Sequence, residues 1–434
     1  MPGLATRTRR EFLLAAGVTT ACGTQPAPKH KPKKENPVIL LRAGWQWENI
    51  GDVAQAPGLL RLLRQYVPGA KVILWSNALG HGVERMLRRN FPRIRIVRGD
   101  TVPDGVPTEE PLREAFREAD FLLHGSGPSV VARRQVEAWR ARTGKPYGIF
   151  GVTITTESEA ASPRLDADLK DLLNGAAFVY TRETRSLENL KRAGIRATIG
   201  FAPDSTFSFR LHNDERAKGF LRRYQLGLKQ FIAVVPRLRY TPYDKMRQVN
   251  WSAEKIARRT AVNSEHAEAD HAKLRVVITE WIRKTGLKVL LCPEMTYELD
   301  IIDKLLYHPL PNDVKKNVAR RLNFWLPDEA SSVYRQAAAV VSFECHSPII
   351  AATNDTAPIY IHQPEDGIKR QMWRDIGLTR SIMEVEQVSG RQIAERVLEY
   401  HEYADSTQAQ VHEAVVYARM KQGDGMTALR AALP

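Results

Sequence analysis

Short apolar runs alternate with helix-patterned stretches from Val38 to Asp204, and this alternation limits the folds that the chain can adopt. A strand with one face in water alternates polar and apolar residues, whereas these runs are apolar almost throughout. Apolar strands that are separated by helices are typical of a parallel sheet covered on both faces. The runs read "VILLRAG", "KVILWSN", "IRIVRG", "DFLLHGSG", "PYGIFGVTI", "AFVYTR" and "TIGFAPD".

A second series of the same kind begins after a break in this rhythm. A polar segment with a helical pattern around residues 213–224 leads to "FIAVVPRLRY", where we expect a strand at 231–238. Four further apolar runs follow, which read "LKVLLCPE", "LNFWLP", "AAVVSFEC" and "APIYIH". Two series of this type predict two separate parallel sheets.

We therefore predict an α/β fold with two doubly wound, Rossmann-like domains that face a cleft. The first domain is expected at residues 38–215 and the second at 226–385. Helical patterns at 389–403 and 405–421 predict that helices in the segment 386–434 close the chain.

The N-terminus has the pattern of an export signal. Arg9 and Arg10 precede a short apolar run that ends in small residues, and this order is similar to a twin-arginine signal over residues 1–22. Cys22 is a candidate lipidation site, or else a residue near an ordinary cleavage site. Residues 23–37 are rich in Pro and Lys and predict a solvated linker. We expect the twin-arginine export machinery as a partner, and a location in the periplasm or tethered to the membrane of the cell envelope.

The net charge of the chain favours anionic partners but does not identify one class of them. The formal net charge is +15, of which residues 1–36 carry +5 from seven Lys/Arg and two acidic residues. The remaining +10 is spread along the chain, which suits sugar phosphates, acidic polymers or anionic membrane surfaces. No nucleic-acid-binding module is recognisable, so we expect no nucleic-acid partner. Cys292 and Cys345, far apart in the sequence, do not form a disulfide framework.

Polar clusters follow many of the predicted strands. Ligands of doubly wound sheets bind beyond the carboxyl ends of the strands, so these clusters are the candidate site residues. Caps and turns explain many polar strand ends equally well. The clusters are Asn49–Asp52, Gly125–Gly127, Arg182–Glu183, Pro203–Asp204, Pro236–Arg237, Cys292–Glu294 and Glu344–His346. From them we predict a set of donor- or anion-binding residues: Asn49, Gly51, Asp52, Gly125, Gly127, Arg182, Asp204 and Arg237.

Several of these residues have two interpretations. Asp52 is either part of an anion site at a helix N-terminus or the N-cap of that helix. Arg182 and Arg237 end strands in different domains, so they would clamp an anionic ligand if they faced each other. The alternative for Arg182 is a surface salt bridge with Asp204. Gly125 and Gly127, with Pro128 at the start of a helix, do not complete a dinucleotide fingerprint, and we expect no nicotinamide or flavin cofactor.

His266 and Asp270 lie four residues apart in a helical pattern, a spacing at which both side chains could ligate a metal ion. A solvated helix face produces the same spacing, and we predict no metal site.

The segment "ECHSPII" places three reactive residue types at one strand end, before a helix. His346 is the candidate general acid or base, and Glu344 the candidate residue that orients or assists it. A buried, hydrogen-bonded histidine is the alternative for His346. Cys345 has no suitable partner for nucleophilic chemistry and is interpreted as a small core residue.

The order of these clusters resembles that of the polysaccharide pyruvyl transferase family, whose fold is similar to that of the two-domain GT-B glycosyltransferases. The Asn-x-Gly-Asp motif with a Leu-rich helix is similar to Asn49–Leu60, and the Gly-rich strand end to Gly125–Gly127. The late His before a small-residue helix corresponds to His346. Two further matches are the Arg-Glu-x-x-Ser-x-x-x-Leu motif at Arg182, Glu183, Ser186 and Leu190, and the Pro-Asp step at Pro203 and Asp204.

The resemblance implies transfer of a pyruvyl group from phosphoenolpyruvate to a glycan or glycan precursor as a ketal. It implies His346 as the acid/base, with Arg182 and Arg237 near the donor anion. The sequence departs from the family where Glu344 replaces an Arg, and Arg237 is the residue that would compensate. Two other functions fit the same fold: an exported glycan-binding relative without catalysis, and a glycosyltransferase that uses a nucleotide sugar.

Overall fold

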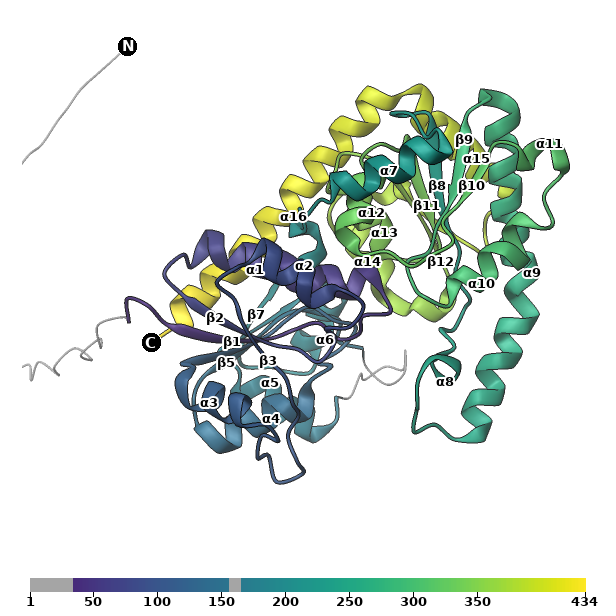
Figure 1. Ribbon diagram of the computed structural model, residues 1–434. Coiled ribbons are helices and arrows are strands. Elements are labelled where there is room, and N and C mark those ends of the chain that lie inside the picture. The colour runs from purple at the N-terminus through teal and green to yellow at the C-terminus, as the bar shows by residue number, and fades with distance from the viewer. Residues whose placement is uncertain (1–33, 156–164) are drawn as a thin grey trace, which may run out of the picture. The chain divides into compact units, whose positions relative to one another are not determined.

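The computed structural model describes residues 34–155 and 165–434 (Figure 1). The predicted signal at 1–22, its Cys22 and most of the predicted linker at 23–37 lie outside the described residues. Lys34, near the end of that linker, is anchored to the first domain. Its Nζ lies 2.8 Å from Asp120 Oδ2, and its backbone N–H donates to the Pro434 carbonyl at 2.8 Å.

The first sheet is entirely parallel and has seven strands in the order β3-β2-β1-β4-β5-β6-β7. All five residues of its central strand β1 are buried, as expected for a strand covered on both faces. The strands are β1 (Val38–Arg42), β2 (Lys71–Trp75), β3 (Arg95–Val97), β4 (Phe121–His124), β5 (Tyr147–Val152), β6 (Phe178–Thr181) and β7 (Thr198–Phe201).

Helices cover both faces of this sheet (Figure 1). On one face Leu59 and Leu63 of α1 share an apolar cluster with Met426 of α16. On the other face Phe116 and Trp139 belong to a second cluster. The first face carries α1 (Ile50–Tyr66), α2 (Val83–Asn90) and α16 (Ala404–Ala432), and the second carries α3 (Glu110–Glu118), α4 (Arg133–Thr143), α5 (Ala167–Gly175) and α6 (Thr184–Arg192).

The second sheet repeats the topology of the first, with six parallel strands in the order β10-β9-β8-β11-β12-β13. It follows a connection that contains η1 (Ser205–Ser208) and α7 (Asp214–Tyr224). In each sheet the second and third strands are added on one side of the first strand, and the chain then returns to add the later strands on its other side. The prediction of two doubly wound domains is therefore confirmed. The strands are β8 (Phe231–Val235), β9 (Lys288–Leu291), β10 (Val318–Arg320), β11 (Ala339–Ser342), β12 (Ala357–His362) and β13 (Ile382–Glu384).

Two details of the second series differ from the sequence-based expectation. The strand expected at 231–238 ends at Val235. The run "LNFWLP" is not a strand, because β10 precedes it and α12 begins at its last residue, Pro327. Trp325 instead packs in the apolar layer between sheet and helices, and its Nε1 donates to the Pro293 carbonyl at 2.9 Å.

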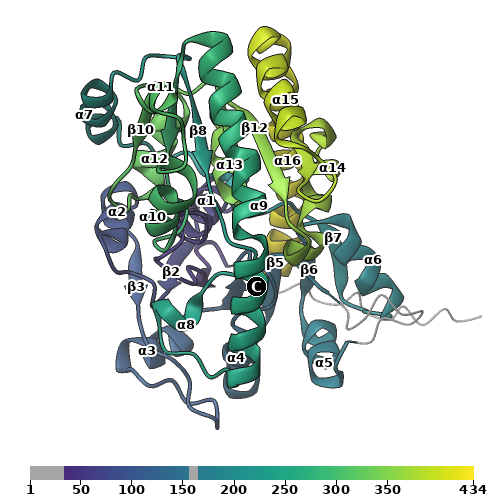
Figure 2. The same cartoon turned by 90° about the vertical axis from the view of Figure 1, so that its right-hand side faces the viewer.

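Helices also cover both faces of the second sheet. The long helix α9 lies along one face beside α15 (Figure 2). The helices of this domain are α8 (Tyr243–Met246), α9 (Ala253–Thr285), α10 (Glu298–Ile301), the π-helix η2 (Ile302–Tyr307), α11 (Asn312–Lys315), α12 (Pro327–Tyr334), α13 (His346–Ala352), η3 (Pro364–Arg370), α14 (Gln371–Asp375), η4 (Thr379–Ser381) and α15 (Gly390–Glu402). In the described part of the chain no helix is both long and apolar enough to cross a bilayer.

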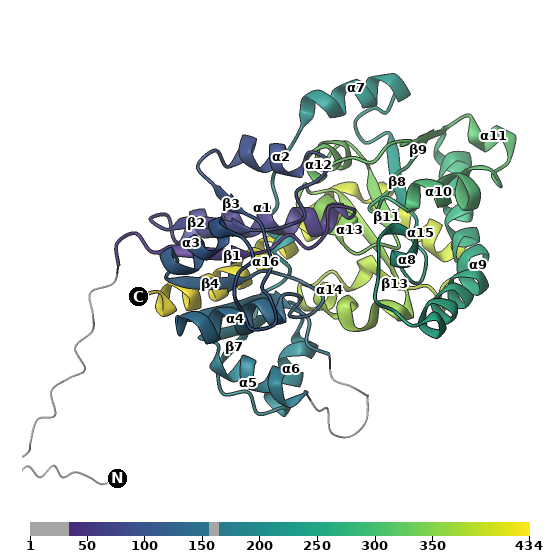
Figure 3. The same cartoon turned by 60° about the horizontal axis from the view of Figure 1, so that its bottom comes forward.

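The last helix, α16, ends at Ala432 and not at residue 421 as expected. Gly423 and Gly425 interrupt the helical pattern in the sequence. In the structure they permit close packing: a Cβ on Gly423 would lie 2.5 Å from the Tyr66 Oη, and one on Gly425 would lie 2.6 Å from the Phe150 ring. The extended helix contacts strands of both sheets, β6 and β7 of the first and β12 of the second (Figure 3).

Candidate active site

The candidate site lies where both sheets reverse their strand order. In the first sheet the reversal falls between β1 and β4, and in the second between β8 and β11. Asn49 follows β1, and His346 follows β11. Ligands of doubly wound sheets bind at such positions, so the two domains present their expected binding edges to each other.

Helix α1 joins the two domains through its first turn. The Ile50 N–H donates to the Glu294 carbonyl at 3.0 Å, and the Thr296 N–H donates to the Glu48 carbonyl at 3.0 Å. Ile50 and Ala54 are buried in an apolar cluster of the second domain. We call this contact, between residues 49–55 and residues 294–298 and 344–347, the interdomain seam.

Asn49 starts α1 and orders its first turn. Its Oδ1 accepts from the N–H groups of Gly51 at 2.7 Å and Asp52 at 3.1 Å. The interpretation of Asp52 as the N-cap is therefore wrong, because the carboxylate lies inside the first turn. There it accepts from Gln46 Nε2 at 2.5 Å. Burial is the main cause of the raised pKa of Asp52.

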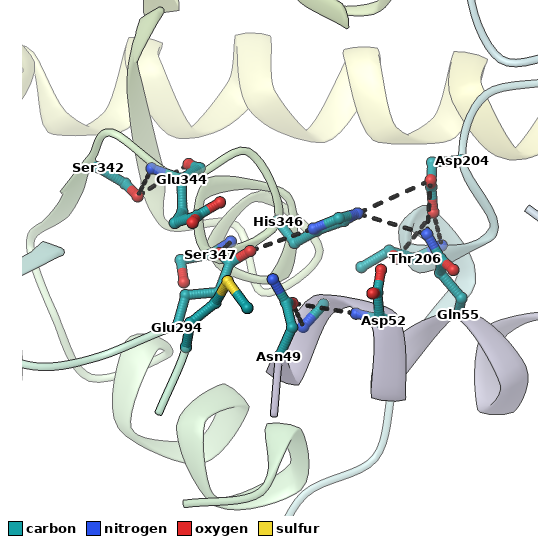
Figure 4. Close-up of polar contacts among 12 residues, drawn as sticks. Asn49, Asp52, Gln55, Asp204, Thr206, Glu294, Ser342, Glu344, His346 and Ser347 are labelled. Carbon is teal, nitrogen blue, oxygen red and sulfur yellow. Dashed lines mark hydrogen bonds and ion pairs between the residues drawn. The ribbon is translucent and has the colours of Figure 1, made fainter. Parts of the chain in front are cut away.

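Gly51 makes room for His346. A Cβ at residue 51 would lie 2.1 Å from Cγ of the His346 ring, so only glycine allows the ring to pack against α1. This contact joins the first turn of α1 to the first residue of α13 (Figure 4).

His346 lies between carboxylates of both domains (Figure 4). Its Nδ1 is 3.1 Å from Glu294 Oε1, and its Nε2 is 3.9 Å from Asp204 Oδ2. Glu294 Oε2 also accepts from the Ser347 N–H at 2.6 Å, which holds the start of α13 in place. The imidazole side chain is 13 % exposed, so it is the part of this group that a ligand can reach.

These neighbours set the protonation state of His346. Burial lowers its pKa, but hydrogen bonds and charge from Asp204 and Glu294 outweigh burial and raise the pKa well above its ordinary value. For Asp204, burial raises the pKa, but His346 and Arg182 hold it well below its ordinary value. The seam thus contains an imidazolium at neutral pH, which can donate a proton.

Arg182 is occupied by protein carboxylates. Its Nη1 is 3.1 Å from Asp204 Oδ2, and its Nε donates to Thr153 Oγ1 at 2.7 Å. The Arg182 side chain is only 2 % exposed. The alternative pairing with Asp204 is the one that forms, although it is buried rather than at the surface. Glu183 lies next to this pair, and burial raises its pKa to about 7.

Arg237 is occupied in the same way. Its Nε lies 3.0 Å from Glu344 Oε1 and its Nη1 lies 3.0 Å from Asp366 Oδ1. Arg237 therefore neutralises Glu344, the residue at which the sequence departs from its resemblance. The clamp of two free arginines is not formed. Burial raises the pKa of Glu344 to about 7, against the opposing charge of Arg237.

The Gly-rich segment Gly125–Gly127 contacts residues next to the seam through Ser126. Ser126 Oγ accepts from the Ser205 N–H at 2.9 Å, directly after Asp204, and the Ser126 carbonyl accepts from Trp45 Nε1 at 2.6 Å. Pro128 is not at the start of a helix, because α4 begins at Arg133.

The remaining candidate residues have structural partners. Asp270 accepts from Arg239 Nε at 2.7 Å, and His266 Nε2 lies 3.9 Å from Glu265 Oε2. Among the residues that the structure describes, no group of three or more His, Cys, Asp or Glu is arranged to hold a metal ion. Cys345 packs in an apolar cluster, as predicted, and burial raises the pKa of its thiol.

Three residues of the seam were not among the predicted site residues. Glu294 was noted at a strand end but given no role. Gln55 donates from Nε2 to Asp204 Oδ2 at 3.1 Å, and its position four residues after Gly51 on α1 is a helical spacing that identifies the same face. Glu298 accepts from the Glu294 N–H at 2.6 Å, and burial raises its pKa well above the ordinary value.

A cavity of about 500 Å³ opens beside the seam. Trp47 and Glu48 of the first domain line it together with residues of α9, α10 and the segment after β8. Gln46, next to the lining residue Trp47, donates from Nε2 to Asp52 Oδ2 and to Tyr243 Oη, the latter at 3.1 Å. Its charged lining residues are the cations Lys245, Arg259 and Lys304 and the carboxylates Glu48, Asp244 and Asp300.

Comparison with solved structures gives the class of the fold. A putative UDP-N-acetylglucosamine 2-epimerase from Listeria monocytogenes is similar with a TM-score of 0.55 at 9% identity, covering 87% of this chain and 91% of that one. The UDP-GlcNAc 2-epimerase from Neisseria meningitidis has a TM-score of 0.54 at 10% identity, over 92% and 99% of the chains. Anabaena Alr3699/HepE, solved with UDP-glucose, has a TM-score of 0.52 at 10% identity, over 91% and 100%. At these identities the likeness shows the fold alone, which is GT-B-like.

The family is defined by the sequence. Residues 49–361, well over half of the chain and including every residue of the seam, match the family model described as polysaccharide pyruvyl transferase. The chain belongs to this family. No curated protein matches the sequence.

Proposed function

We propose that this protein transfers a pyruvyl group from phosphoenolpyruvate to a glycan or glycan precursor. The observation that carries the proposal is the His346 imidazolium between Glu294 and Asp204, inside the region that matches the family. Its raised pKa makes it an acid at neutral pH, and the reaction begins by protonating a carbon.

The chemistry can be balanced with the residues of the seam. His346 delivers a proton to the methylene carbon of the enol phosphate while a sugar hydroxyl bonds to the neighbouring carbon. The carbon–oxygen bond to phosphate then breaks, the departing phosphate takes up the proton released by the first hydroxyl, and a second hydroxyl completes the ketal and gives its proton back to His346. Glu344, with a pKa of about 7, is suited to receive the hydroxyl proton near neutral pH.

The donor anion needs cations that are not already paired. Arg182 and Arg237 are occupied, so we place the donor in the cavity beside the seam, near Lys245, Arg259 and Lys304. None of these three forms an ion pair with a carboxylate of the described chain. Arg259 is ordered by a hydrogen bond from Nη2 to the Thr241 carbonyl at 3.2 Å and by its position over the Trp251 ring, 4.6 Å from the centroid.

Binding of phosphoenolpyruvate to the full chain, followed as a thermal shift against UDP and GDP, tests the proposal. A ligand at about a hundred times its dissociation constant adds about 2.7 kcal/mol to stability. We expect phosphoenolpyruvate to stabilise the protein and Arg259→Gln to remove this effect. Stabilisation by a nucleotide alone would indicate a glycosyltransferase. A bound glycan without turnover would indicate a non-catalytic relative.

The role of His346 is tested by His346→Gln, which keeps a hydrogen-bonding side chain but cannot donate a proton from a cation. Loss of a general acid typically costs 10²- to 10⁴-fold in rate, and we expect a loss of about this size in phosphate release from phosphoenolpyruvate with a glycan acceptor. Phosphoenolpyruvate binding should remain. Full activity of the variant would exclude His346 as the acid.

We also propose export by the twin-arginine route, on the basis of Arg9 and Arg10 in the leader. Replacing both with Lys should leave the protein in the cytoplasm, as measured by cell fractionation. A membrane tether through Cys22 would be lost in Cys22→Ser, which should move the protein from the membrane fraction to the periplasm.

A further inference from the structure

Four arginines from three segments of the chain gather far from the active site. Arg61 and Arg64 are on α1, Arg210 is in the connection between the sheets, and Arg419 is on α16, which packs against α1. The first three line a hollow of about 390 Å³ whose other walls include Gln65 and Asn90. We call these four residues and this hollow the arginine pocket.

The arginine pocket contains no counter-charge. No acidic residue lines the hollow, and none of its four arginines forms an ion pair within residues 34–155 and 165–434. Arg182, Arg237 and Arg239 are the contrast: each is buried, and each contacts at least one carboxylate. These three buried arginines have acidic partners, whereas buried Arg42 is satisfied by Gln135 Oε1 and by the Ala43 and Trp75 carbonyls.

The charges in the arginine pocket act on one another. Burial lowers the pKa of Arg419 to about 9, and repulsion from Arg210 and Arg61 adds to this effect. The pKa of Arg61 is lowered by burial and then by Arg210 and Arg64. Arg419 Nε donates to the Phe207 carbonyl at 2.9 Å, but its buried Nη2 has no hydrogen-bond partner. A partly desolvated guanidinium with an unsatisfied N–H group is costly, and an anion would lower that cost.

A basic surface alone does not explain this arrangement. Arg64 lies in the last turn of α1, where a cation is favoured by the helix dipole. Arg61, however, lies about a turn earlier, and Arg419 is in the middle of a long helix. Arg210 belongs to the connection between the two sheets, so its contribution to the hollow depends on the tertiary fold.

We propose that the arginine pocket binds an oxyanion of the phosphate class, either free or as the phosphoryl group of a larger molecule. Guanidinium groups match such oxyanions with paired N–H donors, and the cations of the pocket outnumber the charges of one phosphate. Arg61 is eleven residues after the start of α1, or about 16 Å along the helix, so the site is separate from the seam. A bound anion joins α1, the interdomain connection and α16.

Isothermal titration of the full chain at low salt tests the proposal with inorganic phosphate and with vesicles of phosphatidylcholine, with and without phosphatidylglycerol. The test variant is Arg61→Gln/Arg210→Gln. The control, Arg222→Gln, removes an exposed arginine that lines a different hollow. Each charged hydrogen bond is worth enough that the test variant should bind about 10- to 100-fold more weakly, while the control binds as the wild type.

The two probes separate the sources of the anion. Binding of inorganic phosphate that the test variant loses supports a free or soluble phosphate ligand. Binding only of anionic vesicles, lost in the same variant, supports a lipid phosphate. Absence of both in the wild type, or equal binding by wild type and test variant, overturns the proposal. Arg259→Gln should leave this binding unchanged, since phosphate bound in the cavity beside the seam would respond to that variant.

Stability without ligand distinguishes a binding site from a structural cluster. Without anion the test variant should melt no lower than the wild type, because it removes repulsion, and phosphate should raise only the wild-type melting temperature. A clear drop in the melting temperature of the variant without ligand would show that the arginines serve the fold, and would overturn the proposal. Arg64→Gln, at an exposed position, provides a second variant that should weaken binding without unfolding the chain.

Discussion

The interdomain seam and the arginine pocket lie at opposite ends of α1 and differ in whether their cations are paired with carboxylates. His346 of the seam, and Arg182 and Arg237 beside it, each lie close to at least two carboxylates. In the arginine pocket no carboxylate lines the hollow, and the attraction of Asp355 for Arg419 is weaker than the repulsion from Arg210 and Arg61. Buried charges that are neutralised by their neighbours order the groups around them, whereas a cluster of like charges at the surface without a carboxylate attracts an ion of opposite charge.

This difference limits what the seam can bind. Arg182 and Arg237, which lie beside the seam, cannot bind a donor anion without breaking an existing ion pair. The proposed donor position is therefore in the neighbouring cavity. The accessible feature of the seam is His346, and the surrounding carboxylates hold it charged and oriented. The seam is thus better suited to proton transfer than to holding the phosphate.

The largest expected effect is the loss of Arg182. Arg182→Ala leaves Asp204 and Glu183 buried without their cation, and breaking a buried ion pair costs about 3–5 kcal/mol. Denaturant unfolding measures this loss. Arg185→Ala, an exposed arginine 3.6 Å from Glu188, should cost less than about 1 kcal/mol.

The corresponding substitution in the arginine pocket tests whether its arginines also stabilise the fold. Arg61→Ala should not destabilise the protein in an anion-free buffer, because it removes repulsion rather than an ion pair. If Arg182→Ala and Arg61→Ala have the same effect on unfolding, the two regions do not differ in the way described.

A smaller effect is expected from Gly51→Ala. The new methyl group would overlap the His346 ring, and overpacking of this kind typically costs about 1–3 kcal/mol. Activity should fall as well, because the ring must move. Gly219→Ala is the control: it lies within α7, a Cβ there meets nothing within 4 Å, and alanine favours a helix by up to about 1 kcal/mol. Equal melting temperatures for the two variants would contradict the packing of His346 against α1.

A further expected effect is a change in the pH dependence of stability. The pKa of Glu344 is raised from 4.5 to about 7, so the folded state holds more protons than the unfolded state between these values. Stability from this group therefore falls as pH rises from about 4.5 to 7. Glu344→Gln should become more stable relative to the wild type over that interval, by about 3 kcal/mol.

The control for this pH effect is Glu188→Gln on the exposed part of α6, which should change stability by less than about 0.5 kcal/mol at each pH. Urea unfolding at pH 5 and pH 8 measures both variants. A difference between Glu344→Gln and wild type that stays constant with pH would contradict the raised pKa.

The sequence was sufficient to predict both sheets and the strand ends that meet at the seam, because wholly apolar runs and the strand-end rule depend on local patterns. Asn49, Gly51 and His346 were found in this way. The rule does not predict which charges neutralise one another. Arg237 pairs with Asp366 across 129 residues, and such a pairing depends on how loops from different units pack.

Helix ends and the positions of apolar side chains were harder to predict for related reasons. Gly423 and Gly425 indicate a helix break by propensity, but tertiary packing against Tyr66 and Phe150 requires them inside α16. Trp325 gives "LNFWLP" the composition of a strand, although its side chain fills space between helices and sheet. The arginine pocket has no local signature, since its residues come from three distant segments.

The central claim is that His346 is a cation at neutral pH, ready to donate a proton. A pH titration of the histidine side chains by NMR, with the His346 signal assigned by its absence in His346→Gln, tests this most directly. The account predicts that the His346 imidazole stays protonated well above pH 6.5, because Asp204 and Glu294 favour its charged form. Deprotonation at or below pH 6.5 would contradict the account and leave the proposed transferase without its acid.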